Sequence, residues 1–169
     1  MTDPLSVYQQ RILGMIKKHG FAVQTVFAGE DHSIEPFYAY TMGLSAKGLP
    51  ELLVVGLPLA IAQNFLQTIA ERMRAGVLRA EDGFIITDVA SMPLCLKAVD
   101  LSTAGEFALG ARQLASEHGY PLSFIQVVFP DAKGIFPWQA GCDPAMTKLQ
   151  HLEALLPSGS IPIDPSKLH

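Results

Sequence analysis

The chain has 169 residues, a length typical of one domain and sufficient to bury a core without disulfides or metals. Apolar residues make up 49% of the sequence and charged residues 17%, which excludes a disordered chain and leaves apolar surface for a pocket or a partner. The 12 Lys and Arg residues stand against 16 Asp and Glu, and only Lys17-Lys18 and Arg72/Arg74 group together. We therefore expect no nucleic acid among the partners.

The sequence carries no sign of a membrane segment. Its longest apolar stretch, residues 52–62, is interrupted by Pro58 and is shorter than the ~20 residues that cross a bilayer. The first residues lack the basic and then apolar pattern of a secretory signal. Two cysteines, Cys95 and Cys142, are too few for a disulfide framework. These features predict a cytoplasmic protein with no membrane partner.

The first half of the chain predicts one helix followed by three strands. Asp3-Pro4 is a typical helix start, because Asp accepts hydrogen bonds from the free amides of the first turn and Pro is favoured at the first position. Gly20 follows two lysines and a histidine and is a typical helix end, so a helix is expected over residues 4–18. Runs of β-branched and aromatic residues predict strands over residues 21–27, 37–43 and 51–56.

The second half predicts helices between shorter strands. Pro58 begins a clearly amphipathic helix. Thr103 and Glu106 match a capping box, in which each side chain satisfies the other's backbone amide, so a third helix is expected from Thr103 to about Glu117. Further strands are expected over residues 84–89, 94–99 and 122–129.

This order of elements predicts the fold class and the domain bounds. We expect an α+β domain of two layers, with three helices packed on a mixed or mainly antiparallel sheet of about five to six strands. The continuous apolar run from Leu52 to Val55 predicts a central strand that is covered on both faces. The single domain is expected to span residues 1–150, and residues 151–169 are expected to form a loose C-terminal tail.

Three segments resemble a known family. They are Tyr38-Ala39-Tyr40-Thr41-Met42-Gly43-Leu44, the stretch from Gly48 to Pro58, and Gln126 to Asp131 followed by Gly134 and Phe136-Pro137-Trp138. In this order they resemble the bacterial domain-of-unknown-function family 4262 over residues 10–142. Tyr38, Met42 and Phe129 stand where the family pattern has Phe, Val and Trp. The resemblance implies no settled activity, and it assigns no catalytic residue.

The end of the second predicted strand is one candidate binding site. The hydroxyls of Tyr40 and Thr41 can orient a ligand, and Gly43 lets a ligand approach the backbone. The alternative is structural, because aromatic and β-branched residues favour strands and Gly43 begins a turn.

Glu51 and Trp138 are candidates for the same ligand site. A carboxylate at the rim of the core, where Glu51 opens an apolar strand, can act as a base or anchor a ligand. Its structural alternative is an edge charge that pairs with a lysine or arginine. Trp138, next to Pro137, can form the wall of a pocket, or it can fill the bottom of the core instead.

An acidic loop carries the candidate for catalysis. Glu30, Asp31, His32 and Glu35 crowd together, so His32 could serve as a general base, with Glu51 as a second group. The alternative is a solvated turn. The histidines show no metal-ligand spacing, so we expect no metal, and no motif identifies a nucleotide or flavin, so any cofactor is unknown.

Two further polar residues are interpreted as turn residues. Ser45 lies in a Gly43-x-Ser45-x-x-Gly48 pattern that lacks the second glycine and the following helix of a nucleophile elbow. Asp131 begins a Pro-Asp-x-x-Gly pattern that is typical of a turn.

Three functional interpretations follow. We favour a non-catalytic module that binds a small molecule or has a regulatory role, with Tyr40, Thr41, Gly43, Glu51 and Trp138 at its site. The first alternative is a small enzyme, hydrolytic or otherwise, that uses His32 and Glu51 in one cleft. The second alternative is a protein-interaction subunit, such as a homodimer that buries the apolar surplus.

Overall fold

The computed structural model describes residues 4–26 and 37–157. The elements, in chain order, are α1 (Pro4–His19), β1 (Ala22–Val26), β2 (Tyr38–Met42), the 3-10 helix η1 (Leu44–Lys47), β3 (Glu51–Val55), α2 (Leu59–Arg74), β4 (Ile85–Ile86), β5 (Leu94–Ala98), α3 (Leu101–Phe107), α4 (Leu109–His118), β6 (Phe124–Val128), α5 (Ala145–Leu149) and α6 (Leu152–Leu155).

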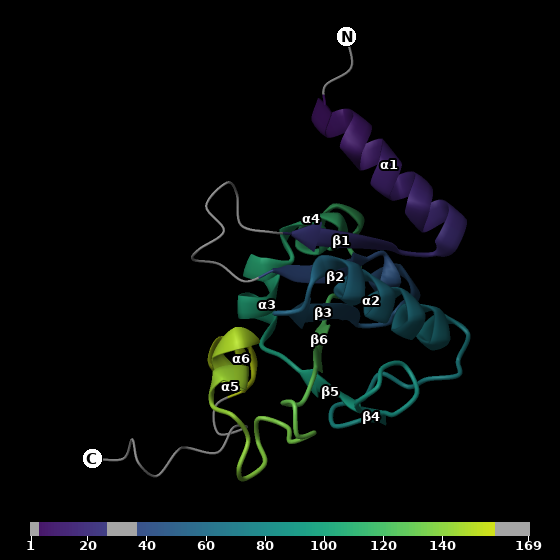
Figure 1. The fold of residues 1–169 in the computed structure, drawn as a ribbon. Helices are drawn as coiled ribbons and strands as arrows, with labels where there is room; N and C mark the ends of the chain where they lie inside the picture. Colours follow the sequence, from purple (N-terminus) through teal and green to yellow (C-terminus); the bar gives the residue numbers. More distant parts are fainter. Residues whose placement is uncertain (1–3, 27–36, 158–169) are drawn as a thin grey trace.

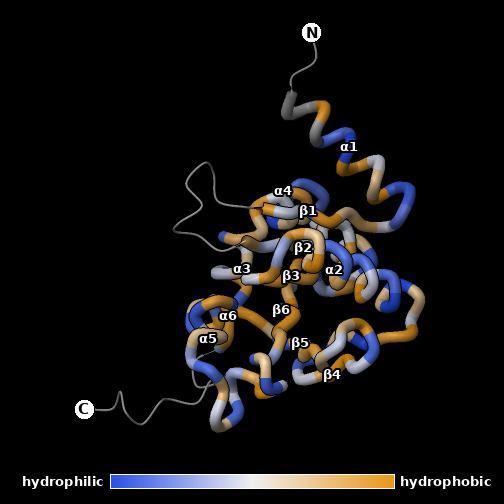
Figure 2. The backbone as a smooth tube through the Cα atoms, viewed as in Figure 1, coloured by the Kyte–Doolittle hydropathy of each residue, from blue (hydrophilic) through white to orange (hydrophobic). Residues whose placement is uncertain are grey.

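The strands form one mixed sheet in the order β1-β2-β3-β6-β5-β4 (Figure 1). Strands β3 and β6 are parallel, and every other neighbouring pair is antiparallel. All five residues of β3 and all five of β6 are buried, because both strands lie in the middle of the sheet and are covered on both faces. The α+β class and the mixed sheet predicted from the sequence are confirmed, and Figure 2 shows apolar stretches around β3 and β6 in the middle of the sheet.

Helices pack on both faces of this sheet. Helix α2 covers one face with Ala62, Leu66, Ile69, Ala70 and Met73, whose spacing of three or four residues gives the helix one buried side. On the other face, α3, α4 and α6 contribute Ala104, Ala111 and Leu155 to a cluster with residues of β2 and β3. Helix α1 adds Ile12 to this cluster, but its N-terminal part extends away from the body (Figure 1).

The helix predicted over residues 103–117 is two helices. The chain turns at Ala108, which has φ −100° and ψ 59° and is fully buried between α3 and α4. Helix α3 begins earlier than predicted, because the side chain of Asp100 accepts a hydrogen bond from the Thr103 amide at 2.9 Å. Asp100 therefore caps the helix in place of the expected Thr103–Glu106 pair.

The expected loose tail from residue 151 differs from the structure over residues 151–156. Leu152 and Leu155 have no exposed surface, and Leu156 is 4% exposed. They belong to the short helix α6 and its end. Leu152 and Leu156 pack with Cys95, Val128 and Phe136, whereas Leu155 belongs to the cluster with residues of β2 and β3. Residues 158–169 lie outside the described part of the chain.

Candidate functional site

The most elaborate polar cluster surrounds Glu51, the first residue of β3. Its carboxylate accepts hydrogen bonds from the Thr41 hydroxyl at 2.8 Å and the Ser45 hydroxyl at 3.0 Å. It also accepts three backbone N–H bonds, from Gly43 at 3.0 Å, Leu44 at 3.2 Å and Ser45 at 3.2 Å. Glu51 therefore caps the beginning of η1, because the preceding residue, Gly43, has no side chain that could accept these hydrogen bonds.

This cluster is closed to solvent. Glu51 and Thr41 have no exposed surface, and Ser45 is 1% exposed. Thr41 also accepts the Leu52 amide at 2.8 Å, so its hydroxyl joins β2 to β3. Burial raises the pKa of the Glu51 carboxyl above its ordinary value, and hydrogen bonds from Thr41, Ser45 and Gly43 act against that rise. The partners of Glu51 are amides and hydroxyls instead of the lysine or arginine considered above.

Gly43 is required by the backbone at this point. It has φ +105°, a conformation that favours glycine, and an added Cβ would lie 3.0 Å from the Ile16 side chain. Its amide points at Glu51. Gly43, Thr41, Ser45 and Glu51 thus form one buried unit that fixes the turn between β2 and β3.

The other predicted site residues lie apart from this unit. Tyr40 and Thr41 point to opposite faces of the sheet, because neighbouring residues of a strand alternate. The Tyr40 hydroxyl accepts the Gly110 amide of α4 at 3.2 Å. Trp138 stacks on Phe136 with ring centroids 5.0 Å apart, and the Lys97 ammonium lies 5.2 Å from the Trp138 ring. His32 lies outside the described residues.

A groove between α1 and α4 was missed by sequence reasoning. It has a volume of about 160 Å³, and its lining residues are Gln9, Ile12, Leu13, Met42, Gly110, Gln113, Leu114, Glu117 and His118. An added Cβ on Gly110 would lie 2.8 Å from the Tyr40 hydroxyl and 2.9 Å from the Met42 sulfur. Gly110 therefore lets α4 approach β2, and an isolated glycine inside a predicted helix was the signal available in the sequence.

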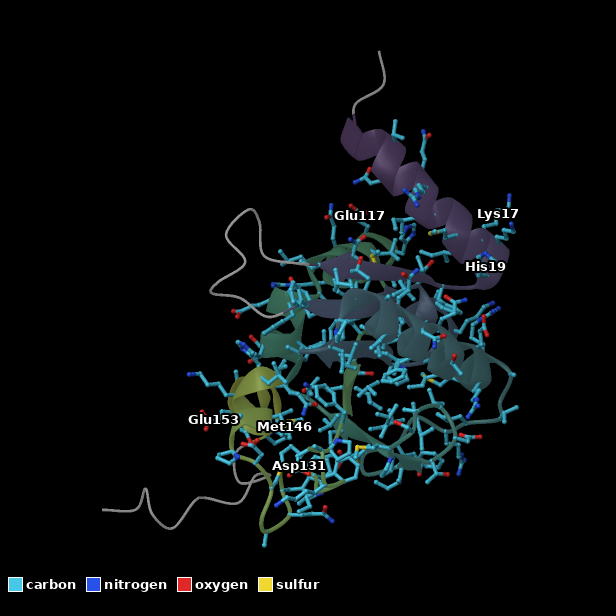
Figure 3. All side chains as sticks on the ribbon, viewed as in Figure 1. Lys17, His19, Glu117, Asp131, Met146 and Glu153 are labelled. Carbon is cyan, nitrogen blue, oxygen red and sulfur yellow. The ribbon has the colours of Figure 1, made fainter. Side chains whose placement is uncertain are left out.

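Asp131 is the turn residue predicted from its Pro-Asp-x-x-Gly pattern. One carboxylate oxygen accepts the amides of Lys133 and Ile135, both at 2.9 Å, and the other accepts the Asp143 amide at 3.0 Å. The Asp131 carbonyl accepts the Gly134 amide at 2.9 Å. Asp131 lies far from α4 and Glu117 in the molecule (Figure 3).

The stabilising effect of Asp131 is expected to disappear at acid pH. Hydrogen bonds from the amides of Ile135, Asp143 and Lys133 hold the pKa of Asp131 below its ordinary 3.8. A lowered carboxyl pKa gives stability that is present above pH 3.8 and is lost as the pH falls through the pKa of the folded state. The free-energy difference between the wild type and Asp131→Asn, measured by urea unfolding, should therefore shrink below that pH. A difference that stays constant to the lowest accessible pH would contradict this role.

The two cysteines are free thiols held in unreactive surroundings. Burial raises the pKa of Cys95 to about 11. Burial also raises the pKa of Cys142, and the nearby Asp131 carboxylate adds to the rise. A thiol reacts as its thiolate, so neither environment favours a nucleophile.

Within residues 4–26 and 37–157, no group of three His, Cys, Asp or Glu side chains is arranged to hold a metal ion. None of the helices described in these ranges combines the length and apolar character that crossing a bilayer requires.

Comparison with known proteins identifies a family. The family described as "Domain of unknown function (DUF4262)" matches residues 15–143, which include the three segments quoted above. No curated protein and no solved structure matches the chain. The match covers well over half of the sequence, so the chain belongs to the DUF4262 family.

Proposed function

We propose that this chain is a non-catalytic binding module and that the groove between α1 and α4 is its binding site. The observation that carries the proposal is the lining of this groove, where the apolar side chains of Ile12, Leu13, Met42 and Leu114 meet. Small-ligand sites typically combine an apolar lining with a few polar groups. Here Glu117 is one of the polar groups.

The size of the groove indicates what it can hold. A volume of about 160 Å³ is comparable with the ~150 Å³ cavities that accept one benzene ring. The ligand group we propose is therefore one aromatic ring or one branched aliphatic group, next to a polar or cationic atom that Glu117 can bind. Burying roughly 150 Å² of such a group at about 25 cal/mol per Å² gives ~4 kcal/mol, which corresponds to a Kd of about 1 mM.

The state of Glu51 supports binding over the enzyme alternative. A general base must reach a substrate or a water molecule. Glu51 has no exposed surface, and both of its oxygens accept hydrogen bonds from the chain. We therefore interpret the Glu51 cluster as structural. It holds the end of β2, where Met42 lines the groove.

We also propose that the protein works in a bacterial cytoplasm. The support is the presence of two unpaired cysteines, which suits a reducing compartment, and the resemblance to a bacterial family.

Indole is expected to bind the groove. In methionine-methyl NMR, the Met42 signal should shift saturably with a dissociation constant of about 1 mM, whereas the Met73 signal should not, because Met73 belongs to α2 and is buried on the other face of the sheet. Leu13→Asp should weaken binding at least ~10-fold, because it places a charge in the apolar wall. Val7→Asp is the matched control, because Val7 is 51% exposed on the same helix, Leu13 is 48% exposed, and Val7 does not line the groove.

Two results would sink the proposal. One is a Met42 signal that does not respond up to the solubility limit of indole in a dilute sample of the protein. The other is an equal loss of affinity in Val7→Asp and Leu13→Asp, because the effect would then belong to the helix as a whole.

A further inference from the structure

Helix α1 has an unusual charge for this chain. It carries Arg11, Lys17 and Lys18 and no acidic residue, whereas the whole chain has 12 basic and 16 acidic residues. The remainder of the chain is therefore more acidic than the net charge of −4 indicates. The acidic body of a second copy offers a surface of complementary charge to this basic helix.

The same helix exposes apolar surface next to the groove. Leu13 is 48% exposed and Met15 is 36% exposed, although Ile12 on the same helix is 9% exposed and belongs to the core. Leu13 forms one wall of the groove, and Leu114 of α4 belongs to the lining as well. The N-terminal part of α1 also extends beyond the sheet, where a partner can reach it (Figure 1).

Charged residues lie next to both leucines along their helices. Lys17 follows Leu13 by one helical turn and shares its side of α1, and Glu117 follows Leu114 by about one turn on α4. In Figure 3 Lys17 projects outward from the last turn of α1, well separated from Glu117 on α4. Neither residue belongs to an ion pair among the described residues. Each chain thus presents a leucine–lysine stripe on α1 and a leucine–glutamate stripe on α4.

We propose that the occupant of the groove is a second copy of this chain. In a two-fold dimer the Leu13–Lys17 stripe of each α1 packs on the Leu114–Glu117 stripe of the other copy, so that the same contact forms twice. Leu13 supplies the branched aliphatic group, and Lys17 supplies the cation. This inference rests on the groove being a binding site, as proposed above. A contact between pairs of helices is small for a protein interface, so we expect the dissociation constant of the dimer to be about micromolar or weaker.

A charge exchange tests this contact directly. Light scattering after gel filtration should give twice the 18.3 kDa chain mass at about 1 mM protein and 18.3 kDa at high dilution. Lys17→Glu and Glu117→Lys each place like charges in both contacts, so each variant alone should dissociate at least ~10-fold more readily. An equimolar mixture of the two should form a heterodimer, because both contacts then join a glutamate to a lysine. A change within one chain cannot produce recovery on mixing.

Control variants distinguish a failure of the proposed dimer from a failure of the groove as a binding site. Val7→Asp should dimerise as the wild type does, and Leu13→Asp should remain a monomer. The Lys17→Glu variant is expected to be a monomer, and it should still bind indole, which is seen as a shift of the Met42 signal.

A wild-type chain that is a monomer at every concentration and still binds indole overturns the dimer and leaves the groove as a site for another ligand. A dimer that Leu13→Asp does not weaken, or the absence of recovery on mixing, also overturns it. Failure of indole to bind the monomeric variant overturns the groove as well.

Discussion

Glu51→Gln is expected to lower the free energy of unfolding by about 4 kcal/mol at neutral pH. The carboxylate accepts three backbone amides and two hydroxyls in a site with no exposed surface. Glutamine keeps the shape of the side chain but replaces one acceptor oxygen by an NH₂ group that faces donors. One oxygen accepts the amides of Gly43 and Ser45 and the other accepts that of Leu44, so the donors at whichever oxygen becomes NH₂ lose an acceptor that water cannot replace. Total stabilities are typically ~5–15 kcal/mol, so this one change removes a large share.

Urea unfolding followed by circular dichroism gives the measurement. Glu106→Gln is the matched control, because Glu106 is exposed on α3 and the same substitution there should change the free energy by less than ~0.5 kcal/mol. Thr41→Val tests the hydroxyl separately, because it removes one bond to Glu51 and one acceptor for Leu52. It should cost about 2 kcal/mol. If Glu51→Gln were as stable as its control, the cluster would not hold the β2–β3 turn.

The sequence was sufficient to identify the centre of the sheet and the need for a turn at Gly43. The apolar run from Leu52 to Val55 predicted a covered strand, and all four residues have no exposed surface. Such local patterns report burial directly, because a strand with both faces covered has no polar side. The fold class followed from the order of these elements.

The contacts of Glu51 could not be predicted in the same way. Its sequence context, after Pro50 and before an apolar strand, fits a charge at a sheet edge. Its acceptor role depends on how η1 turns the amides of Gly43, Leu44 and Ser45 toward one point, and this geometry is tertiary.

The groove was not predictable for a related reason. Its walls come from α1 and α4, which are separated in the sequence by about ninety residues that include strands β1 to β5. A single sequence gives the apolar side of each helix but not which helices meet. Gly110 was a local sign of close approach, yet it did not indicate that Tyr40 was the partner.

The C-terminal helices were missed because they are short. Helix α5 has five residues and α6 has four, and so few residues cannot show helical periodicity. Their place is fixed by contacts with distant strands. The Gln150 side chain donates to the Phe129 carbonyl at 2.9 Å and accepts the Phe129 amide at 3.0 Å, which extends the ladder beyond the end of β6.

A chain that ends after Asp143, where the family match also ends, is expected to lose its cooperative unfolding transition. It lacks Leu152, Leu155 and Leu156, which are buried, and each such side chain stabilises the fold by roughly 2 kcal/mol. Their removal also exposes apolar neighbours on β5 and β6, Cys95 and Val128 among them. The combined loss of about 6 kcal/mol is comparable with the whole stability of a domain. Thermal unfolding followed by circular dichroism tests this.

Three further variants decide whether the leucines themselves cause the effect. A chain that ends after Pro157 retains α5 and α6, and it should keep the cooperative transition of the wild type. In the full-length chain, Leu152→Ala should cost about 3 kcal/mol, because it leaves a cavity where no surface is exposed. Leu149→Ala, at a position that is 44% exposed, should cost clearly less. If the chain that ends after Asp143 unfolded with the same cooperative transition as the wild type, α6 would not contribute to the stability of the core beside β5.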